Sequence, residues 1–224
     1  SQIYSNFQPE NDSPMVSNLR KSGLLIIGKT NTPEFGIGGQ TFNEVFGTTA
    51  NPFNFKKTAG GSSGGAAAAV QSKLIPFADG SDMMGSLRTP SSFCETFSIR
   101  PTPGLVPSNS TLSYKMPRIS TNGVIARHPM DLALMLDGCI GKKAYFEKLI
   151  RNKFSLRKVT ACIPENYLEN ILVDNKVTKQ FYQNIETFKK LGVKIKKINF
   201  DFEPNLFWDS WIDLRSKIIS LNLK

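Results

Sequence analysis

Short apolar runs alternate along the chain with longer segments of helical periodicity. Residues 24–28 (LLIIG) are a continuous apolar run that is too short for a helix and is typical of a strand buried on both faces of a sheet. Residues 74–82 (LIPFADGSD) predict a second buried strand that runs into a polar turn. Further strands are expected at 159–163 and 193–200. Strands that alternate with helices in this way predict the α/β class.

The expected helices have recognisable start and stop signals. Asp12 or Ser13 before Pro14 is a typical N-cap and first helical residue, and Gly23 is a typical C-terminal stop. The other expected helices lie at residues 129–139, 174–191 and 204–224, and an alanine-rich helix follows Gly65. Residues 30–57 have few periodic apolar positions and predict a long ordered loop, and loops of this length are often functional.

Composition narrows the class of protein. The 224 residues are 40% hydrophobic, which is enough for a core and excludes a fully disordered chain. Neither a long apolar run nor a secretory signal occurs, so we expect no membrane span and a cytoplasmic location. Cys94, Cys139 and Cys162 lack metal-ligand spacing and are interpreted as reduced core thiols. His128 is the single histidine, which excludes a multi-histidine metal centre, and we expect no metal and no cofactor.

The net charge of +10 is concentrated in one segment. Residues 141–200 carry fourteen Lys or Arg against five Asp or Glu. Within residues 193–198 lysines alternate with Val and Ile, which is typical of an element with one solvated face. The segment shows neither the alternation of aromatic and basic residues typical of RNA-binding sheets nor the pattern of a DNA-recognition helix. We therefore interpret this segment as a solvated basic surface and expect no nucleic-acid partner.

Two glycine-rich turns carry the candidate chemistry. Residues 60–65 (GGSSGG) precede a helix whose first N–H groups are free to face a negative group, and residues 80–86 (GSDMMGS) predict an anion-binding nest. If Ser86 ends this nest, its hydroxyl and the N–H donors converge on one carbonyl carbon, as acyl transfer requires. A flexible linker at 60–65 and an N-cap role for Ser86 are the alternatives. A P-loop is excluded because no Gly-Lys-Ser/Thr closes the motif.

These turns and their surroundings resemble the signature region of the amidase signature family. The resemblance is carried by FGTTANP (46–52), TAGGSSGG (58–65), GSD (80–82), GSLR (85–88) and Pro90, and is extended by GKTN (28–31), PEF (33–35) and RPTPG (100–104). In that family a serine of the GGSS loop, held by a cis peptide bond, lies 24 residues before the nucleophilic serine, and Ser62 lies 24 residues before Ser86. The resemblance implies an incomplete amidase signature fold, with a mixed, largely parallel sheet flanked by helices. It also implies one domain over residues 1–224, truncated at both ends.

The chemistry that the resemblance implies is amide (C–N) bond hydrolysis by a Ser-Ser-Lys triad. Ser86 is expected to attack the amide carbonyl, and Ser62 to relay its proton toward a lysine base and back to the leaving amine. The oxyanion hole is expected to consist of the backbone N–H groups of Met83, Met84, Gly85 and Ser86. Structural support is expected from a pair formed by Asp82 and Arg88, and from Gly60, Gly61 and Ser63. Serine is a weak nucleophile at neutral pH, and a desolvated neutral lysine can act as its base.

The chain departs from the family pattern in two ways. The family lysine lies further upstream of the GGSS loop than this chain extends, and no lysine present here occupies its position. The lysines considered are Lys29, Lys56, Lys57 and Lys73. Met84 stands where the family usually has the first of two glycines, and a side chain there restricts the backbone angles. An inactive chain is therefore one expectation.

Two other functions stay open beside hydrolysis. One is a non-catalytic remnant of the fold that binds an anion or a carboxylate through the glycine-rich turns. The other is ammonia transfer like that of the tRNA-dependent amidotransferases, which ranks lower because the loop after Arg100 lacks the form associated with those proteins. The expected partner is a small-molecule linear amide, and a homodimer is considered as the assembly.

Overall fold

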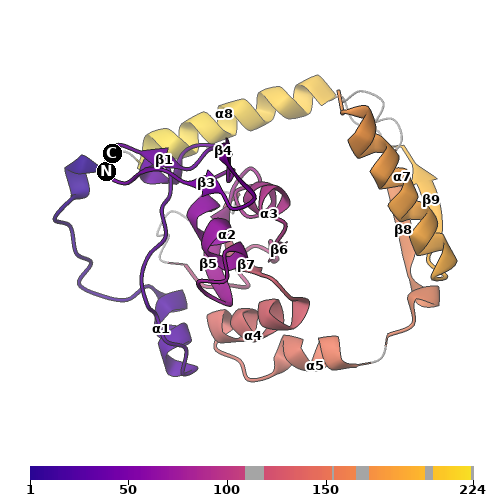
Figure 1. Cartoon of the computed structure of the whole chain (residues 1–224), viewed down its shortest axis with the longest axis horizontal. Helices are drawn as coiled ribbons and strands as arrows, with labels where there is room; N and C mark the ends of the chain where they lie inside the picture. The colour runs from indigo at the N-terminus through magenta and orange to yellow at the C-terminus, as the bar shows by residue number, and fades with distance from the viewer. Residues whose placement is uncertain (109–118, 153, 165–171, 200–203, 223–224) are drawn as a thin grey trace. The chain divides into compact units, whose positions relative to one another are not determined.

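The computed structural model describes residues 1–108, 119–152, 154–164, 172–199 and 204–222 (Figure 1). The chain folds as two compact units, Ser1–Asn152 and Lys153–Lys224. Both glycine-rich turns lie in the first unit. This unit therefore holds the candidate site, and the fold of the second unit is described by itself.

A three-stranded antiparallel sheet forms the centre of the first unit. Its strands are β5 (Phe77–Asp82), β7 (Thr121–Ala126) and β6 (Phe97–Ile99), in the order β5-β7-β6. Gly80 lies opposite Gly123 in the register of β5 and β7, and Asp82 lies opposite Thr121. The predicted strand at 74–82 is thus confirmed from Phe77 onward, and its polar end leads directly into the turn that carries Ser86.

Helices α2 (Gly64–Gln71) and α4 (Pro129–Ile140) cover opposite faces of this sheet. Successive side chains of a strand point to opposite faces, and Val124 and Ile125 of β7 belong to two different clusters of buried side chains. The cluster around Ile125 includes Ala66, Ala67 and Val70 from α2, and the cluster around Val124 includes Met135, Leu136 and Cys139 from α4. β7 is therefore a central strand that is buried on both faces.

Helix α1 (Pro14–Lys21) packs on α4 through its buried residues Met15 and Leu19. It begins as the sequence predicts, because the Ser13 hydroxyl accepts a hydrogen bond from the Val16 N–H at 3.3 Å and Pro14 is the first helical residue. Helix α5 (Tyr145–Arg151) also contacts α4, and the short helix α3 (Arg88–Phe93) follows the Ser86 turn.

Residues 30–57, predicted as a long ordered loop, contain two short antiparallel hairpins. Strand β1 (Phe42–Asn43) pairs with β2 (Gly47–Thr48), and β3 (Ala50–Asn51) pairs with β4 (Asn54–Thr58). Single 3-10 turns lie at η1 (Gln2–Tyr4), η2 (Glu34–Gly36) and η4 (Leu156–Lys158). The β4 strand delivers the chain to the GGSSGG loop.

The buried strand predicted at 24–28 is wrong for the described chain. Leu25 is 86% exposed and Ile27 is 70% exposed, and the segment has no strand conformation. A strand is defined by hydrogen bonds to a neighbour, and none of the described strands pairs with this segment. Apolar composition favours a buried strand, but composition alone does not supply the pairing partner.

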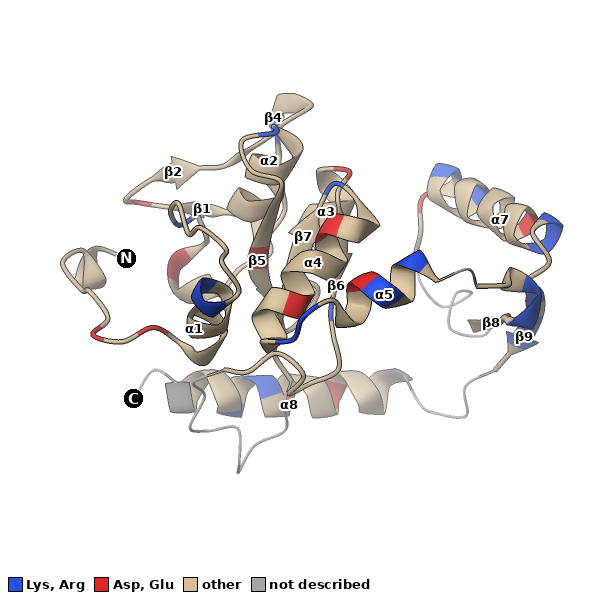
Figure 2. Ribbon diagram, turned by 90° about the horizontal axis from the view of Figure 1, so that it is seen from below, with Lys and Arg blue, Asp and Glu red and all other residues tan. Residues whose placement is uncertain are grey.

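The second unit contains a parallel pair of strands joined by a helix. Strand β8 (Thr160–Pro164) pairs with β9 (Lys194–Ile198), and helix α7 (Asn175–Lys190) connects them. The predicted start of α7 is confirmed, since the Asp174 carboxylate caps it by accepting from the Lys176 N–H at 2.7 Å. Helix α8 (Pro204–Asn222) follows. Lys and Arg lie on α7 and β9 (Figure 2), and the three lysines of β9 are exposed, in agreement with a solvated basic surface.

Both directions of strand pairing occur among the described strands, but the expectation of a largely parallel sheet is wrong for them, because four of their five pairs are antiparallel. Parallel pairing is confined to β8 and β9 among the described strands, whereas the three-stranded sheet is antiparallel. In the part of the chain that the structure describes, no helix is long and apolar enough to cross a membrane. The chain forms two compact units, and whether they belong to a single domain over residues 1–224 stays a prediction.

The three cysteines differ in their surroundings. Cys94 and Cys139 are buried free thiols, as predicted. Burial raises the pKa of the Cys94 thiol to about 11. The pKa of the Cys139 thiol is raised to about 12, and burial is the largest cause. Cys162 is exposed, so the core interpretation is wrong for it. Successive side chains of β8 point to opposite faces. The neighbouring Ile163 is buried on the covered face, so Cys162 points to the exposed one.

Candidate active site

The GGSSGG loop is a buried, tightly packed part of the core. All six residues from Gly60 to Gly65 are buried, and helix α2 begins at Gly64. Gly60 has a φ of 77°, a value that favours glycine, and the peptide bond between Gly61 and Ser62 is cis. A solvated flexible linker has none of this packing, so the linker alternative is excluded.

Glycine is required in this loop because residues 39–41 lie directly against it. A Cβ atom added to Gly61 would lie 2.8 Å from the backbone nitrogen of Gln40, and one added to Gly64 would lie 2.9 Å from the Thr41 Cβ. Real Cβ contacts are not this short. The loop therefore depends on the absence of side chains at these positions, and segment 39–41 acts as the surface on which it rests.

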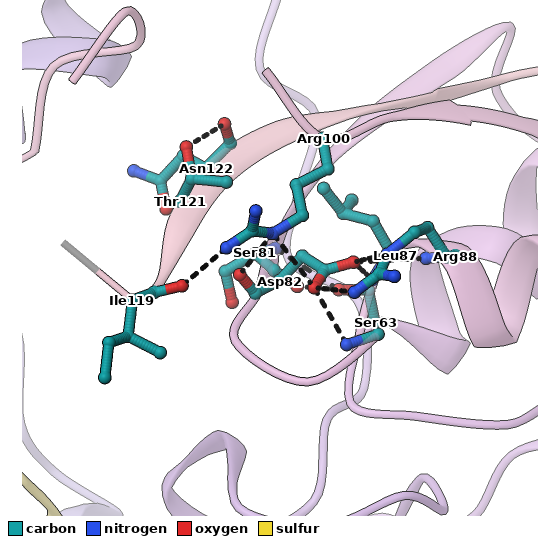
Figure 3. Close-up of polar contacts among 10 residues, drawn as sticks. Ser63, Ser81, Asp82, Leu87, Arg88, Arg100, Ile119, Thr121 and Asn122 are labelled. Atoms are coloured by element: carbon teal, nitrogen blue, oxygen red, sulfur yellow. Dashed lines mark hydrogen bonds and ion pairs between the residues drawn. The ribbon is translucent and has the colours of Figure 1, made fainter. Parts of the chain in front are cut away.

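The turn after β5 is organised by the carboxylate of Asp82 (Figure 3). This side chain is fully buried and accepts hydrogen bonds from the N–H groups of Gly85 at 2.8 Å and Leu87 at 3.2 Å. Arg88 binds the same carboxylate through Nε and Nη2, each at 3.0 Å. The expected pair of Asp82 and Arg88 is thus present, with the Arg88 side chain 61% exposed and the carboxylate wholly enclosed.

These donors keep the buried carboxylate charged. Burial by itself raises the pKa of the Asp82 carboxyl. The hydrogen bonds from Arg88 and from the N–H groups of Gly85 and Leu87 act in the opposite direction and outweigh burial, so the pKa of Asp82 lies below its ordinary value. A charged Asp82 therefore fixes the backbone on both sides of Ser86.

The backbone N–H groups of the turn are not equivalent. The Gly85 N–H, expected in the oxyanion hole, is directed to Asp82 instead, and this residue has a φ of 111°. The N–H groups of Met83, Met84 and Ser86 donate no hydrogen bond within the described residues. Met83 is half-buried directly after β5. Three of the four predicted donors, the N–H groups of Met83, Met84 and Ser86, are therefore left for a substrate oxygen in this structure.

Met84 fits the turn without the freedom of glycine. Its φ is not among the positive values of the non-glycine residues, and its side chain is 51% exposed. The restriction expected from a methionine at this position therefore does not distort the backbone here. The left-handed geometry falls on Gly85, where it is tolerated.

The Ser86 hydroxyl does not cap the following helix. Helix α3 begins at Arg88 with Leu87 as its N-cap, and no side chain makes a capping hydrogen bond there. Among the described residues we find no hydrogen bond made by the hydroxyl of Ser86 or by that of Ser62. Ser86 is half-buried and Ser62 is 5% exposed. The N-cap alternative is therefore excluded. The Ser86 hydroxyl has no hydrogen-bond partner among the described residues, so it is unoccupied.

Ser63 joins the two glycine-rich turns. Its N–H donates to the Ser86 carbonyl at 3.2 Å. Its hydroxyl accepts from the Ser81 N–H at 3.3 Å and lies 3.4 Å from the Ser81 carbonyl oxygen, to which it donates. Ser62 and Ser86 thus belong to two turns that are hydrogen-bonded to one another.

No buried lysine accompanies these serines in the part of the chain that the structure describes. Lys29, Lys56, Lys57 and Lys73 are all exposed. A lysine that acts as a neutral base is desolvated by burial, and none of these four side chains is buried. His128 is exposed at the start of α4, the helix on the sheet face opposite α2. The described residues also contain no cluster of three or more His, Cys, Asp or Glu that could hold a metal ion.

Two residues of the site escaped sequence reasoning. Arg100 lies at the end of β6, where its Nε is 3.3 Å from the Asp82 carboxylate and its Nη2 donates to the Ile119 carbonyl at 2.6 Å (Figure 3). Thr41 is 1% exposed and its hydroxyl bonds the GGSSGG loop. A charged residue directly after an apolar strand could have marked Arg100 as a candidate site residue. A single threonine in a segment without periodicity gave no signal that could have identified Thr41.

Comparison with known proteins decides the family. A sequence model described as Amidase matches residues 1–211 of the chain. The chain belongs to the amidase signature family. The predicted family is thereby confirmed over nearly the whole chain.

Curated relatives within the amidase signature family include A subunits of glutamyl-tRNA(Gln) amidotransferase. The one from Legionella pneumophila (strain Paris) is 32% identical over 217 residues, which are 93% of this chain and 44% of that protein. The one from Thermus thermophilus is 31% identical over 210 residues, covering 91% of this chain and 44% of that protein. The chain thus spans less than half the length of these relatives.

Solved structures of the amidase signature family confirm the predicted fold. A crystal structure of the glutamyl-tRNA(Gln) amidotransferase A subunit from Thermotoga maritima matches with a TM-score of 0.82 and 25% identity, covering 100% of this chain and 51% of that one. 6-Aminohexanoate cyclic dimer hydrolase in complex with substrate matches with a TM-score of 0.76 and 28% identity, covering 88% and 43%. A bacterial aryl acylamidase of the family gives 0.76 and 26%, covering 96% and 46%.

Proposed function

We propose that this chain takes part in amide (C–N) bond hydrolysis and that Ser86 forms an acyl-enzyme. The observation that supports this most is the unoccupied Ser86 hydroxyl on a turn that the buried Asp82 carboxylate holds and that Ser63 joins to the loop of Ser62. Membership of the amidase signature family supports an amide as the substrate class.

The proposed reaction has two stages. The Ser86 Oγ forms a bond to the amide carbonyl carbon while the carbonyl electrons move to oxygen, and the free N–H groups of Met83, Met84 and Ser86 stabilise that oxyanion. The Ser86 proton passes through Ser62 toward a lysine base, and a proton returns by the same route to the leaving nitrogen as the C–N bond breaks. Water then attacks the ester carbon, and the acid and the free Ser86 hydroxyl are released.

The lysine of this Ser-Ser-Lys triad has no counterpart among the 224 residues. We therefore expect the chain alone to acylate slowly, because none of the lysines that the structure describes is buried and able to take the Ser86 proton before attack. Oxyanion stabilisation and a positioned nucleophile act without the base, so a reactive acylating reagent is expected to modify Ser86 even where amide turnover is low.

Ammonia transfer is the second candidate function, and the relatives favour it. Proteins 31–34% identical to this chain are A subunits of glutamyl-tRNA(Gln) amidotransferase. The identity of these relatives gives ammonia transfer more support than the sequence alone did. The sequence argument against it relied on the loop after Arg100, and part of that loop, residues 109–118, lies outside the described residues. Hydrolysis and ammonia transfer share the acyl-Ser86 step and differ in whether the ammonia is released to water or passed to a second acceptor.

The acyl-Ser86 step is tested by fluorophosphonate labelling of the purified chain, with peptide mass spectrometry to locate the adduct. The expected result is an adduct on Ser86 that is absent in Ser86→Ala and formed more slowly in Ser62→Ala. Ser72→Ala, at an exposed position after α2, is the matched control and is expected to label at the wild-type rate. A folded wild-type chain that gives no adduct on Ser86 would contradict the proposal.

The non-catalytic alternative predicts a different outcome of the same experiment. In that case Ser86 is not labelled, and acetate raises the melting temperature of the chain because it binds the N–H groups of the two turns. A small linear amide as substrate, a cytoplasmic location and a homodimer are further predictions of the proposed function, which substrate profiling, localisation imaging and size-exclusion chromatography can address.

A further inference from the structure

A single hydroxyl, that of Thr41, contacts the GGSSGG loop on both sides of Ser62. It donates to the Gly60 carbonyl at 2.8 Å and lies 3.4 Å from the Ser62 carbonyl. It also accepts from the Gly64 N–H at 3.1 Å. The side chain is 1% exposed, so water does not replace these bonds. The hydroxyl thus connects the residue two before Ser62, Ser62 itself and the residue two after it.

Thr41 is itself held firmly by its neighbours. Its carbonyl accepts from the Thr49 N–H at 2.9 Å, beside the β1-β2 hairpin. The Thr49 hydroxyl in turn accepts from the Asn31 amide at 3.1 Å. On the other side, Gln40 lies so close to Gly61 that no Cβ fits between them. Segment 39–41, on which the loop rests, is therefore also held by contacts from outside the GGSSGG loop.

We infer that Thr41 is a positioning residue that sets the place of Ser62 relative to Ser86, an inference that rests on the proposed function. Without the hydroxyl, the Gly60 carbonyl and the Gly64 N–H become unpaired in a buried site, which is unfavourable. The loop then moves to satisfy these groups. Ser62 lies between them, and a proton relay works only within hydrogen-bond reach of its donor.

The experiment compares two substitutions that separate the hydroxyl from the bulk of the side chain. Thr41→Val keeps the shape and removes the hydroxyl, and it is expected to slow fluorophosphonate labelling of Ser86 by about 10- to 100-fold, the effect of a misplaced catalytic group. Thr41→Ser keeps the hydroxyl and is expected to restore labelling to near the wild-type rate. Ile125→Val, a core substitution in β7, is the control for general loss of stability.

A second readout follows the loop itself. Hydrogen exchange of the Gly64 amide is expected to become faster in Thr41→Val but not in Thr41→Ser or Ile125→Val, because only the first removes the acceptor of that N–H. A folded Thr41→Val chain that labels at the wild-type rate overturns the inference, and so does a Gly64 amide whose exchange does not change. If wild-type protein is not labelled at Ser86, the result counts against the proposed function and not against the role of Thr41. In that case the hydrogen-exchange rate of the Gly64 amide alone decides whether Thr41 holds the loop.

Discussion

The strongest stability prediction concerns Asp82→Asn. The two carboxylate oxygens of Asp82 accept from the backbone N–H groups of Gly85, Leu87 and Arg88 and from the guanidinium of Arg88, all in a fully buried position. Asparagine has nearly the same shape but only one acceptor oxygen. Its NH2 group faces a second donor, so either the Gly85 N–H or the Leu87 N–H loses its partner.

The expected cost follows from these contacts. A buried donor left unpaired costs about 1–3 kcal/mol. The lost attraction to Arg88 adds only about 0–1 kcal/mol, since that side chain is 61% exposed and well solvated. Arg100, which also faces the carboxylate, contributes in the same direction. We expect a total loss of about 1–4 kcal/mol from the free energy of unfolding.

Asp12→Asn is the matched control. Asp12 forms an ion pair with Arg20 at 2.7 Å, which is shorter than the Asp82 pair but exposed. Its substitution is expected to cost less than about 1 kcal/mol. If Asp82→Asn costs no more than Asp12→Asn, then the carboxylate does not organise the turn and the argument for a preformed site fails.

The assay must report on the first unit. Both tryptophans, Trp208 and Trp211, lie in α8 of the second unit, so their fluorescence is unsuitable. Hydrogen exchange of the amides in β5 and β7 measures the opening free energy of the sheet itself. The same amides can be followed in wild-type protein and in both variants.

The pKa of Asp82 adds a pH dependence with a definite sign. Its value in the folded chain lies below the ordinary value, so the contribution of the charged group is fully present above the unfolded-state pKa of about 3.9. The contribution is lost as the pH falls through the lower, folded-state value. The difference in stability between wild type and Asp82→Asn is therefore expected to be constant near neutrality and to shrink below about pH 4.

Three further predictions test other parts of the structure. Gly61→Ala is expected to destabilise the first unit by about 1–3 kcal/mol, because its Cβ meets the Gln40 backbone, whereas Gly28→Ala, which meets no atom within 4 Å, is neutral by the same exchange assay. A thiol reagent at mildly alkaline pH is expected to modify Cys162 in the folded chain and to reach Cys94 and Cys139 only after denaturation, as mass spectrometry can follow. Met84→Gly is expected to leave the rate of Ser86 labelling within about threefold of wild type, because Met84 already has an ordinary φ; a large gain would mean that the methionine obstructs the site.

Local signals in the sequence predicted local structure well. The start of α1 rests on Ser13 and Pro14, and that of α7 on Asp174, because a cap needs only residues that are close in sequence. The two glycine-rich turns could also be located, since glycine at a crowded or positive-φ position leaves a compositional trace. These signals are enough to place Ser62 and Ser86 in two glycine-rich turns.

Features that depend on distant partners could not be predicted in the same way. Residues 24–28 have the composition of a buried strand, but pairing depends on a neighbour elsewhere in the chain. The orientation of the Gly85 N–H is set by the Asp82 side chain, which competes with a substrate oxygen for the same donor. Thr41 meets the GGSSGG loop only through folding, and nothing in its own sequence context marks it.

The bond between the Ser63 N–H and the Ser86 carbonyl is made entirely by the main chain. Replacing the hydroxyl of Ser62 or Ser86 by hydrogen therefore leaves this connection in place. The Ser86→Ala chain is thus suited to serve as a substrate trap: it keeps the arrangement of the two turns but lacks the atom proposed to attack. Crystals of that variant soaked with candidate amides would capture the ligand before any bond is broken.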